Sequence, residues 1–110
     1  MHETFISLIR KNNYNTDDIN MLEALIKLSD MDELQDYLII ASQYGNIEFF
    51  KLMEHYNIEL NFDNFALLHE SIIYKNNDCA KYLYNLYKDT TNIEKYNHFS
   101  TFQKMKEILC

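Results

Sequence analysis

Histidine and cysteine, the side chains that most often bind metals or attack substrates, are few and scattered in this sequence. The four histidines are His2, His55, His69 and His98, and no two stand at the short helical spacing that would place two metal ligands on one face. His69-Glu70 resembles the start of a zinc-protease motif, but no histidine follows four residues after His69. We therefore expect no metal, no cofactor and no catalytic centre, and we expect that the protein is not an enzyme.

The two cysteines, Cys79 and Cys110, do not make a disulfide framework. Free thiols are typical of a reducing compartment, and Cys79 is expected to act as a small buried apolar side chain. The sequence has no apolar run near the ~20 residues of a membrane span, and its first residues lack the pattern of a signal peptide. We expect a cytoplasmic protein without membrane contact.

Charge is strongly one-sided along the chain. The net charge is -7, and residues 1–60 carry eleven acids against four bases, whereas residues 61–110 are balanced. Such a surface disfavours direct binding of nucleic acid, which needs bases to neutralise phosphates. It suits a basic protein partner, or it simply keeps the chain solvated. The acids taken as candidate contact residues are Asp30, Asp32, Glu33 and Asp36.

The composition indicates one all-α domain. The 110 residues include 47% hydrophobic residues, enough for a real core, with one glycine and no proline. A β-sandwich or barrel of this length normally needs more turn residues.

The stretch from Leu38 to Leu86 repeats itself at an offset of 30 residues. Aligned pairs include Tyr44 with Tyr74, Asn46 with Asn76, Glu48 with Asp78, Lys51 with Lys81, and Met53 with Leu83. Repetition at such a period points to stacked helical units that bury their apolar faces against one another. Repeat stacks present extended binding surfaces.

The two units resemble ankyrin repeats. Residues 38–53 read Leu-Ile-Ile-Ala-Ser-Gln-Tyr-Gly-Asn-Ile-Glu-Phe-Phe-Lys-Leu-Met, similar to the family's Leu-His-x-Ala-Ala-x-x-Gly-x-x-x-x-Val-x-x-Leu-Leu. Asn57-Ile-Glu-Leu-Asn61 resembles the closing segment, and Leu67-Leu68-His69 stands in place of Thr-Pro-Leu-His. The resemblance implies that His69 supports the local turn. It also implies an ankyrin-like helix-turn-helix repeat stack with flanking capping helices.

The repeats depart from the family in length. The family period is about 33 residues, and the three missing residues fall between Asn61 and Leu68, where the family places its β-turn finger. The second unit also has Lys75 in place of the glycine. The expected organisation is residues 1–30 as N-terminal helices or a degenerate repeat, 31–61 as the first repeat, 62–90 as the second, and 91–110 as a C-terminal capping helix.

Local signals predict where the helices begin and end. Thr16 and Asp30 are expected N-caps, and Gly45 is expected to take the left-handed conformation that ends a helix. The other expectations are a buried Ile19, a helix over 65–75 capped by Asp63 or Asn64, and a helical turn over 93–98.

The resemblance places the contact residues at the ends of the inner helices, on the concave side, and on the connecting tip. The residues expected to touch a partner are Gln43, Tyr44, Ile73 and Tyr74 on the helices, with Phe62, Asp63 and Phe65 on the tip. Shortening the tip could instead fold Phe62 and Phe65 into the core.

Two functions follow as hypotheses. The first is a small non-enzymatic module that binds a protein partner through its concave face. The second is an acidic inhibitor of phage or viral type, acting in a host cytoplasm, that blocks a nucleic-acid-binding defence protein by imitating phosphates. A homo-oligomer is a further alternative, because two recognisable units are few for a stack and at least three are usually needed.

Overall fold

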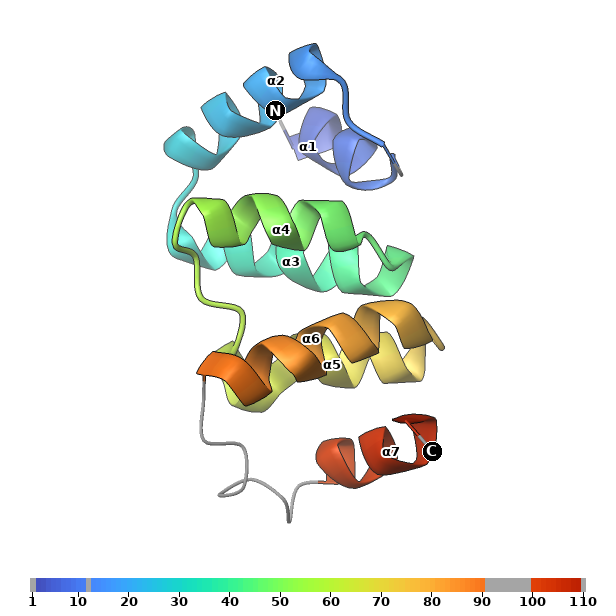
Figure 1. The fold of residues 1–110 in the computed structure, drawn as a ribbon. Helices are drawn as coiled ribbons and strands as arrows, with labels where there is room; N and C mark the ends of the chain where they lie inside the picture. The colour runs from blue at the N-terminus through green and yellow to red at the C-terminus, as the bar shows by residue number, and fades with distance from the viewer. Residues whose placement is uncertain (1, 12, 91–99, 110) are drawn as a thin grey trace.

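The computed structural model describes residues 2–11, 13–90 and 100–109, and over this range every regular element is a helix (Figure 1), which confirms the expected all-α class. The helices are α1 (His2–Ile9), α2 (Thr16–Leu28), α3 (Met31–Tyr44), α4 (Ile47–His55), α5 (Phe62–Ile73), α6 (Asn77–Thr90) and α7 (Ser100–Leu109). The predicted turn over 93–98 lies outside the described residues.

The helices are arranged in layers. Helices α1 and α2, α3 and α4, and α5 and α6 form successive hairpins, and α7 packs against α5 and α6 (Figure 1). Between layers, α1 packs on α3, α3 on α5, and α5 on α7. The result is an elongated molecule of 40 × 22 × 20 Å in which α1, α3 and α5 form one continuous row.

Side-chain caps set the starts of three helices. Asp30 Oδ1 accepts a hydrogen bond from the Glu33 amide at 2.9 Å, as predicted. The cap of α2 is Asn15, not Thr16 as predicted. Asn15 Oδ1 accepts from the Asp18 amide, and the Asp18 carboxylate accepts from the Asn15 amide, which makes a reciprocal capping box.

Gly45 ends α3 in the left-handed conformation, with φ 71° and ψ 31°, as predicted. A Cβ atom at this position would lie 3.1 Å from Asn76 Cγ, so the glycine also lets the next layer approach closely. Lys75, at the equivalent position of the second unit, adopts a similar φ of 60° although it carries a side chain.

The left-handed backbone at Lys75 gives a stability prediction. Replacing Lys75 with glycine is expected to raise the free energy of unfolding by about 0.5–1 kcal/mol, because a Cβ atom is unfavourable in this region. The measurement is the urea midpoint of the variant against wild type. Lys75→Ala, which keeps the Cβ atom, should leave the midpoint unchanged, and equal midpoints for glycine and alanine would contradict the explanation.

Each of the two central hairpins has one asparagine, at equivalent positions, that joins it to the layer before it. Asn46 Nδ2 donates to the Ile9 carbonyl at 2.6 Å, the Lys11 carbonyl at 3.1 Å and the Tyr14 hydroxyl oxygen at 2.8 Å. Its Oδ1 accepts from the Phe49 amide and caps α4. One buried side chain therefore satisfies backbone groups of two layers.

Asn76 repeats this contact one layer further along. Its Nδ2 donates to the carbonyl oxygens of Ser42 and Gln43 at 2.9 and 2.8 Å. These carbonyls lie in the last turn of α3, where a helix leaves acceptors without an internal partner. The 30-residue echo of the sequence thus corresponds to a repeated contact between layers.

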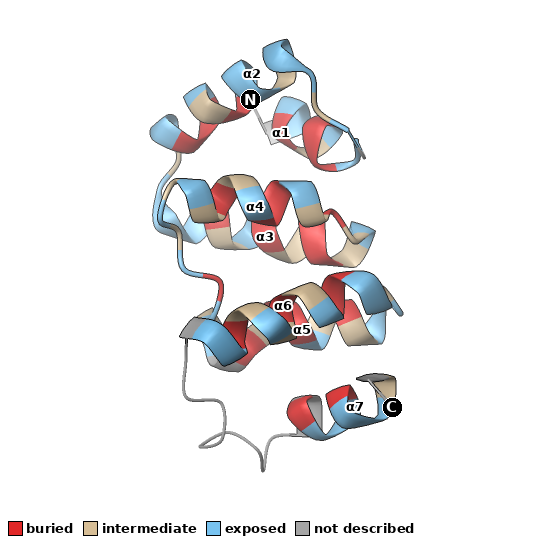
Figure 2. Cartoon of the chain, in the orientation of Figure 1, coloured by how far each residue is buried: buried red, intermediate tan, exposed pale blue. Residues whose placement is uncertain are grey.

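Aromatic side chains fill the spaces between layers, and the buried residues lie on the facing sides of the helices (Figure 2). Phe5 stacks on Tyr37 with ring centroids 4.0 Å apart and meets Phe49 edge-on at 5.9 Å. At the other end of the stack, Phe65 lies edge-on to Tyr87 and Phe102, each at 4.9 Å. These contacts hold α7 against the third hairpin.

Two details of the core differ from the sequence-based expectation. Ile19 is exposed because Leu22, Leu25 and Ile26 form the buried stripe of α2 without it. Helix α5 begins at Phe62 rather than Phe65, and Asn61 occupies its N-cap position without a side-chain hydrogen bond.

Candidate partner-binding surface

Exposed aromatic and aliphatic side chains gather where α3 and α5 end. Tyr44 is 50% exposed, and Ile73 and Tyr74 are each 53% exposed. The predicted exposure of Tyr44 and Tyr74 is confirmed. Because these tyrosines are equivalent positions in adjacent layers, they stand at the same edge of the stack. We call Tyr44, Ile73 and Tyr74 the aromatic edge.

The Tyr44 ring is held in place from the preceding layer. Arg10 Nε donates to the Tyr44 hydroxyl oxygen at 3.1 Å, and the guanidinium carbon lies 5.5 Å from the ring centroid. A cation over an aromatic face is attractive, and the planar guanidinium restricts how the ring can turn. The ring is therefore presented to solvent in an ordered position.

Gln43 joins the second layer to the third. Its Nε2 donates to Glu70 Oε2 at 3.4 Å, and the residue is half-buried. Between the two turns that follow α3 and α5 lies a hollow of about 360 Å³, lined by Tyr44, Gly45 and residues 75–79. Tyr44 forms one wall of this hollow.

The solvent-facing stripes of α3 and α5 continue away from the aromatic edge. Their members recur at helical spacing, and all are exposed or half-buried. They are Asp32, Asp36, Ile39 and Gln43 on α3, and Phe62, Ala66, His69 and Ile73 on α5. We call these stripes, together with the aromatic edge, the inner face. The second helix of each hairpin, α4 or α6, packs on another side of α3 or α5 (Figure 1).

The structure places the candidate acids of α3 at the opposite end of that helix from Tyr44. Asp30, Asp32, Glu33 and Asp36 are all exposed, but they lie at the start of α3, whereas Tyr44 is its last residue. Twelve residues of helix separate Asp32 from Tyr44, which is about 18 Å at 1.5 Å per residue. That is about twice the screening length in physiological salt.

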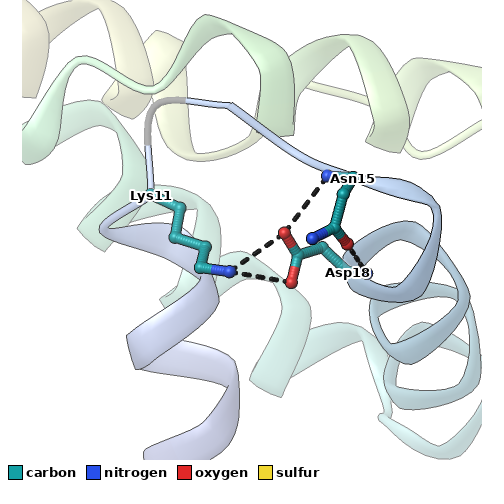
Figure 3. A network of polar contacts seen from close by, with 3 residues as sticks. All are labelled: Lys11, Asn15 and Asp18. Atoms are coloured by element: carbon teal, nitrogen blue, oxygen red, sulfur yellow. Dashed lines mark hydrogen bonds and ion pairs between the residues drawn. The ribbon is translucent and has the colours of Figure 1, made fainter.

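Asp18, at the start of α2, is held by hydrogen bonds within its own layer. Both carboxylate oxygens of Asp18 accept from Lys11 Nζ, at 2.9 and 3.0 Å, and one of them also accepts from the Asn15 amide (Figure 3). The hydrogen bond from Lys11 has the largest effect and the one from the Asn15 amide the second largest, and together they hold the pKa of Asp18 below its usual range. Asp18 therefore anchors the turn between α1 and α2 and is not a free charge.

The Asp18 contacts give a pH prediction. A carboxyl group with a lowered pKa in the folded state stabilises the protein at high pH and loses this contribution as pH falls through that pKa. Asp18→Asn should be less stable than wild type at pH 7. The difference in stability between the two proteins should disappear as the pH falls below the ordinary aspartate pKa of 3.8. Urea midpoints of both proteins from pH 7 to pH 3 measure this. A gap of constant size at every pH would contradict the prediction.

Among the tip residues expected to touch a partner, the expectation for Phe65 is wrong, and the alternative that it folds into the core holds. Its side chain is 3% exposed and lies between Tyr87 and Phe102, so it is a core residue. Burial of the ring accompanies an irregular first turn of α5, in which Asp63 and Phe65 have positive φ. Phe62 is half-buried and packs against the core, whereas Asp63 is exposed.

Sequence reasoning missed Arg10 as a member of the surface. It precedes Tyr44 by 34 residues, in a segment without a recognisable repeat, and nothing local indicates the contact. The pairing of Asn46 and Asn76 was visible in the repeat, but their carbonyl partners become apparent only when the layers are stacked. The resemblance implied that His69 supports the local turn. His69 is instead exposed, and no hydrogen bond joins its side chain to another described residue, so this expectation is wrong.

The described residues hold no group of three histidine, cysteine or acidic side chains that could bind a metal ion. Cys79 is buried, as predicted, and receives a hydrogen bond from Ser71 Oγ at 3.3 Å. Burial raises the pKa of its thiol to about 11, which keeps it protonated and weakly nucleophilic at neutral pH. Across the described part of the chain, no helix has the length and apolar character needed to cross a membrane.

Comparison with protein-family models, with curated proteins and with solved structures found no match to this chain.

Proposed function

We propose that this protein is a non-enzymatic interaction module of ankyrin-like type, which binds a protein partner through its inner face. The observation that carries the proposal is the aromatic edge. Three large apolar side chains, each at least half exposed, stand at one edge of two stacked layers. Tyrosine at such positions offers a large contact area while few rotamers must be frozen on binding.

The ankyrin-like part of the proposal is supported by the repeated layer geometry. Each central hairpin has a left-handed residue after its first helix, followed at once by an asparagine that donates to the preceding layer. The row formed by α1, α3 and α5 gives a stack of three layers, with α7 covering its far end. A stack of this kind has an extended face suited to binding another chain.

The proposed setting is the cytoplasm. Cys79 is a free thiol, and reduced cysteines are typical of cytoplasmic proteins.

The proposal predicts that Tyr44 and Tyr74 carry much of the binding energy. Alanine at both positions should weaken partner binding about 100-fold or more, because anchors of this kind are each worth about 2 kcal/mol. Isothermal titration calorimetry with a partner captured from the source cytoplasm measures the effect. The free energy of unfolding should change by less than about 1 kcal/mol, since both rings are half exposed.

Leu28→Ala is the matched control. Leu28 is an apolar side chain with 69% exposure at the end of α2, whereas the aromatic edge lies where α3 and α5 end. Its loss should leave affinity unchanged. Full affinity in the double tyrosine variant, or an equal loss in the Leu28 variant, would show that the aromatic edge is not the binding surface.

A second candidate function is inhibition by charge mimicry of a nucleic-acid-binding protein. The observation in its favour is that Asp32, Glu33 and Asp36 are exposed and form no ion pair with any described residue. A contact made by these acids would weaken steeply with salt, and neutralising all three would abolish it. Affinity that is constant between 50 mM and 500 mM salt would exclude this function.

A further inference from the structure

The inner face has opposite charges at its two ends. Beside the aromatic edge stand two exposed cations, Arg10 and Lys75, and neither forms an ion pair with a described carboxylate. Arg10 is fixed above Tyr44, so most of its donors stay available. In a chain with a net charge of -7, two unpaired cations at the aromatic edge are unexpected.

The other charges near the aromatic edge are partly committed. Lys11 is paired with Asp18, and Glu70 accepts a hydrogen bond from Gln43. Asp78 lines the same hollow as Lys75 and offsets part of its charge. Arg10 is therefore the principal positive group at this end.

The acidic end lies at the start of α3. Asp32 and Asp36 belong to the solvent-facing stripe of the helix, about 18 and 12 Å from Tyr44 along its axis. Between the two ends the stripes carry side chains such as Ile39, Gln43 and Ala66, which have no formal charge. The face thus runs from acidic through neutral to aromatic and basic.

We propose that the inner face binds one peptide segment of a partner protein in a single direction. The segment places a basic side chain near Asp32 and Asp36, an apolar side chain on the aromatic edge, and a carboxylate on Arg10 and Lys75. This rests on the proposed function and adds the chemistry and polarity of the partner segment. A span of about 18 Å corresponds to five or six extended residues.

Opposite charges at the two ends favour one orientation and penalise the reverse, in which acid faces acid and base faces base. The aromatic edge supplies binding energy in either orientation, because burial of apolar area does not depend on the order of charges in the bound segment. Direction is therefore the property that separates this inference from the proposed function.

The test is selection of peptides from a displayed library of random dodecamers, using the full chain as bait. Four proteins are compared: wild type, Tyr44→Ala with Tyr74→Ala, Arg10→Glu with Lys75→Glu, and a charge-reversed chain that combines the latter pair with Asp32→Lys and Asp36→Lys. Circular dichroism is used to check that each variant is folded. The substituted residues are all exposed.

Wild type should enrich peptides with lysine or arginine on one side of an apolar residue and a carboxylate on the other, in one constant order. The charge-reversed chain should enrich the opposite order, and each selected peptide should bind its own bait at least tenfold more tightly than the other. Suppose that the tyrosine variant loses the enrichment, but that the charge order of the selected peptides is random or stays the same with the charge-reversed chain. That result would overturn the single direction of binding and leave the proposed function intact. No enrichment by wild type, or enrichment kept by the tyrosine variant, would contradict both.

Discussion

Replacing Asn46 with aspartate is expected to lower the free energy of unfolding by about 3 kcal/mol. The side chain is 5% exposed, and its Nδ2 donates to two backbone carbonyls and a hydroxyl oxygen of the preceding layer. Aspartate keeps the oxygen that caps α4 but loses every donor. It also places a charged oxygen against carbonyl oxygens in a buried site.

A loss of this size is a large part of the 5–15 kcal/mol that stabilises a typical domain. Urea denaturation followed by circular dichroism at pH 7 measures it. Asn76→Asp should cost less, because Asn76 is half-buried and its Nδ2 has two acceptors within reach, whereas Asn46 Nδ2 has three.

Asn61→Asp is the matched control for Asn46→Asp. Asn61 also precedes a helix, but it is exposed and makes no side-chain cap bond, so the same chemical change should alter stability by less than about 0.5 kcal/mol. A midpoint for Asn46→Asp as high as that of the control would show that the asparagine does not join the layers.

Phe65→Ala is the second large effect, with an expected loss of about 3–4 kcal/mol in the free energy of unfolding. The ring is buried and touches Tyr87 edge-on and Phe102 edge-on, so its removal leaves a cavity between the third hairpin and α7. Because α7 contacts only α5 and α6 extensively among the described helices, it should detach first.

Hydrogen exchange read by mass spectrometry can localise this loss. In Phe65→Ala, amides of α7 should exchange much faster, while those of α3 and α4 remain protected. Phe62→Ala serves as a control at the neighbouring ring, which is only half-buried, so its expected cost is the roughly 1 kcal/mol of a typical substitution. A free energy of unfolding equal to that of wild type in Phe65→Ala would contradict the placement of this ring in the core.

The helices of this chain were predictable because their signals are local. Asp30 and Gly45 act within a few residues of where they stand, and both behave as predicted. The exposure of Tyr44 and Tyr74 followed from their repeat positions. Two cap assignments failed. Asn15 and Thr16 are both polar and either side chain can reach the start of α2, whereas α5 begins three residues earlier than expected and has no side-chain cap at Asn61.

Contacts between layers were not predictable from local pattern. Whether Phe65 faces solvent depends on Tyr87 and Phe102, which lie 22 and 37 residues further along the chain. The acids are separated from Tyr44 because they stand at opposite ends of α3, and a helix rises 1.5 Å with each residue. The Arg10 contact required the first and second layers to be stacked.

The most direct test of the inner face as the binding surface is a chemical-shift map of the isotope-labelled protein titrated with its captured partner. The proposal predicts that the largest amide shifts occur at Gln43, Tyr44, Ile73 and Tyr74 and continue along the solvent-facing stripes of α3 and α5. Shifts confined to the exposed residues of α4 and α6, with Tyr44 and Tyr74 unchanged, would contradict it.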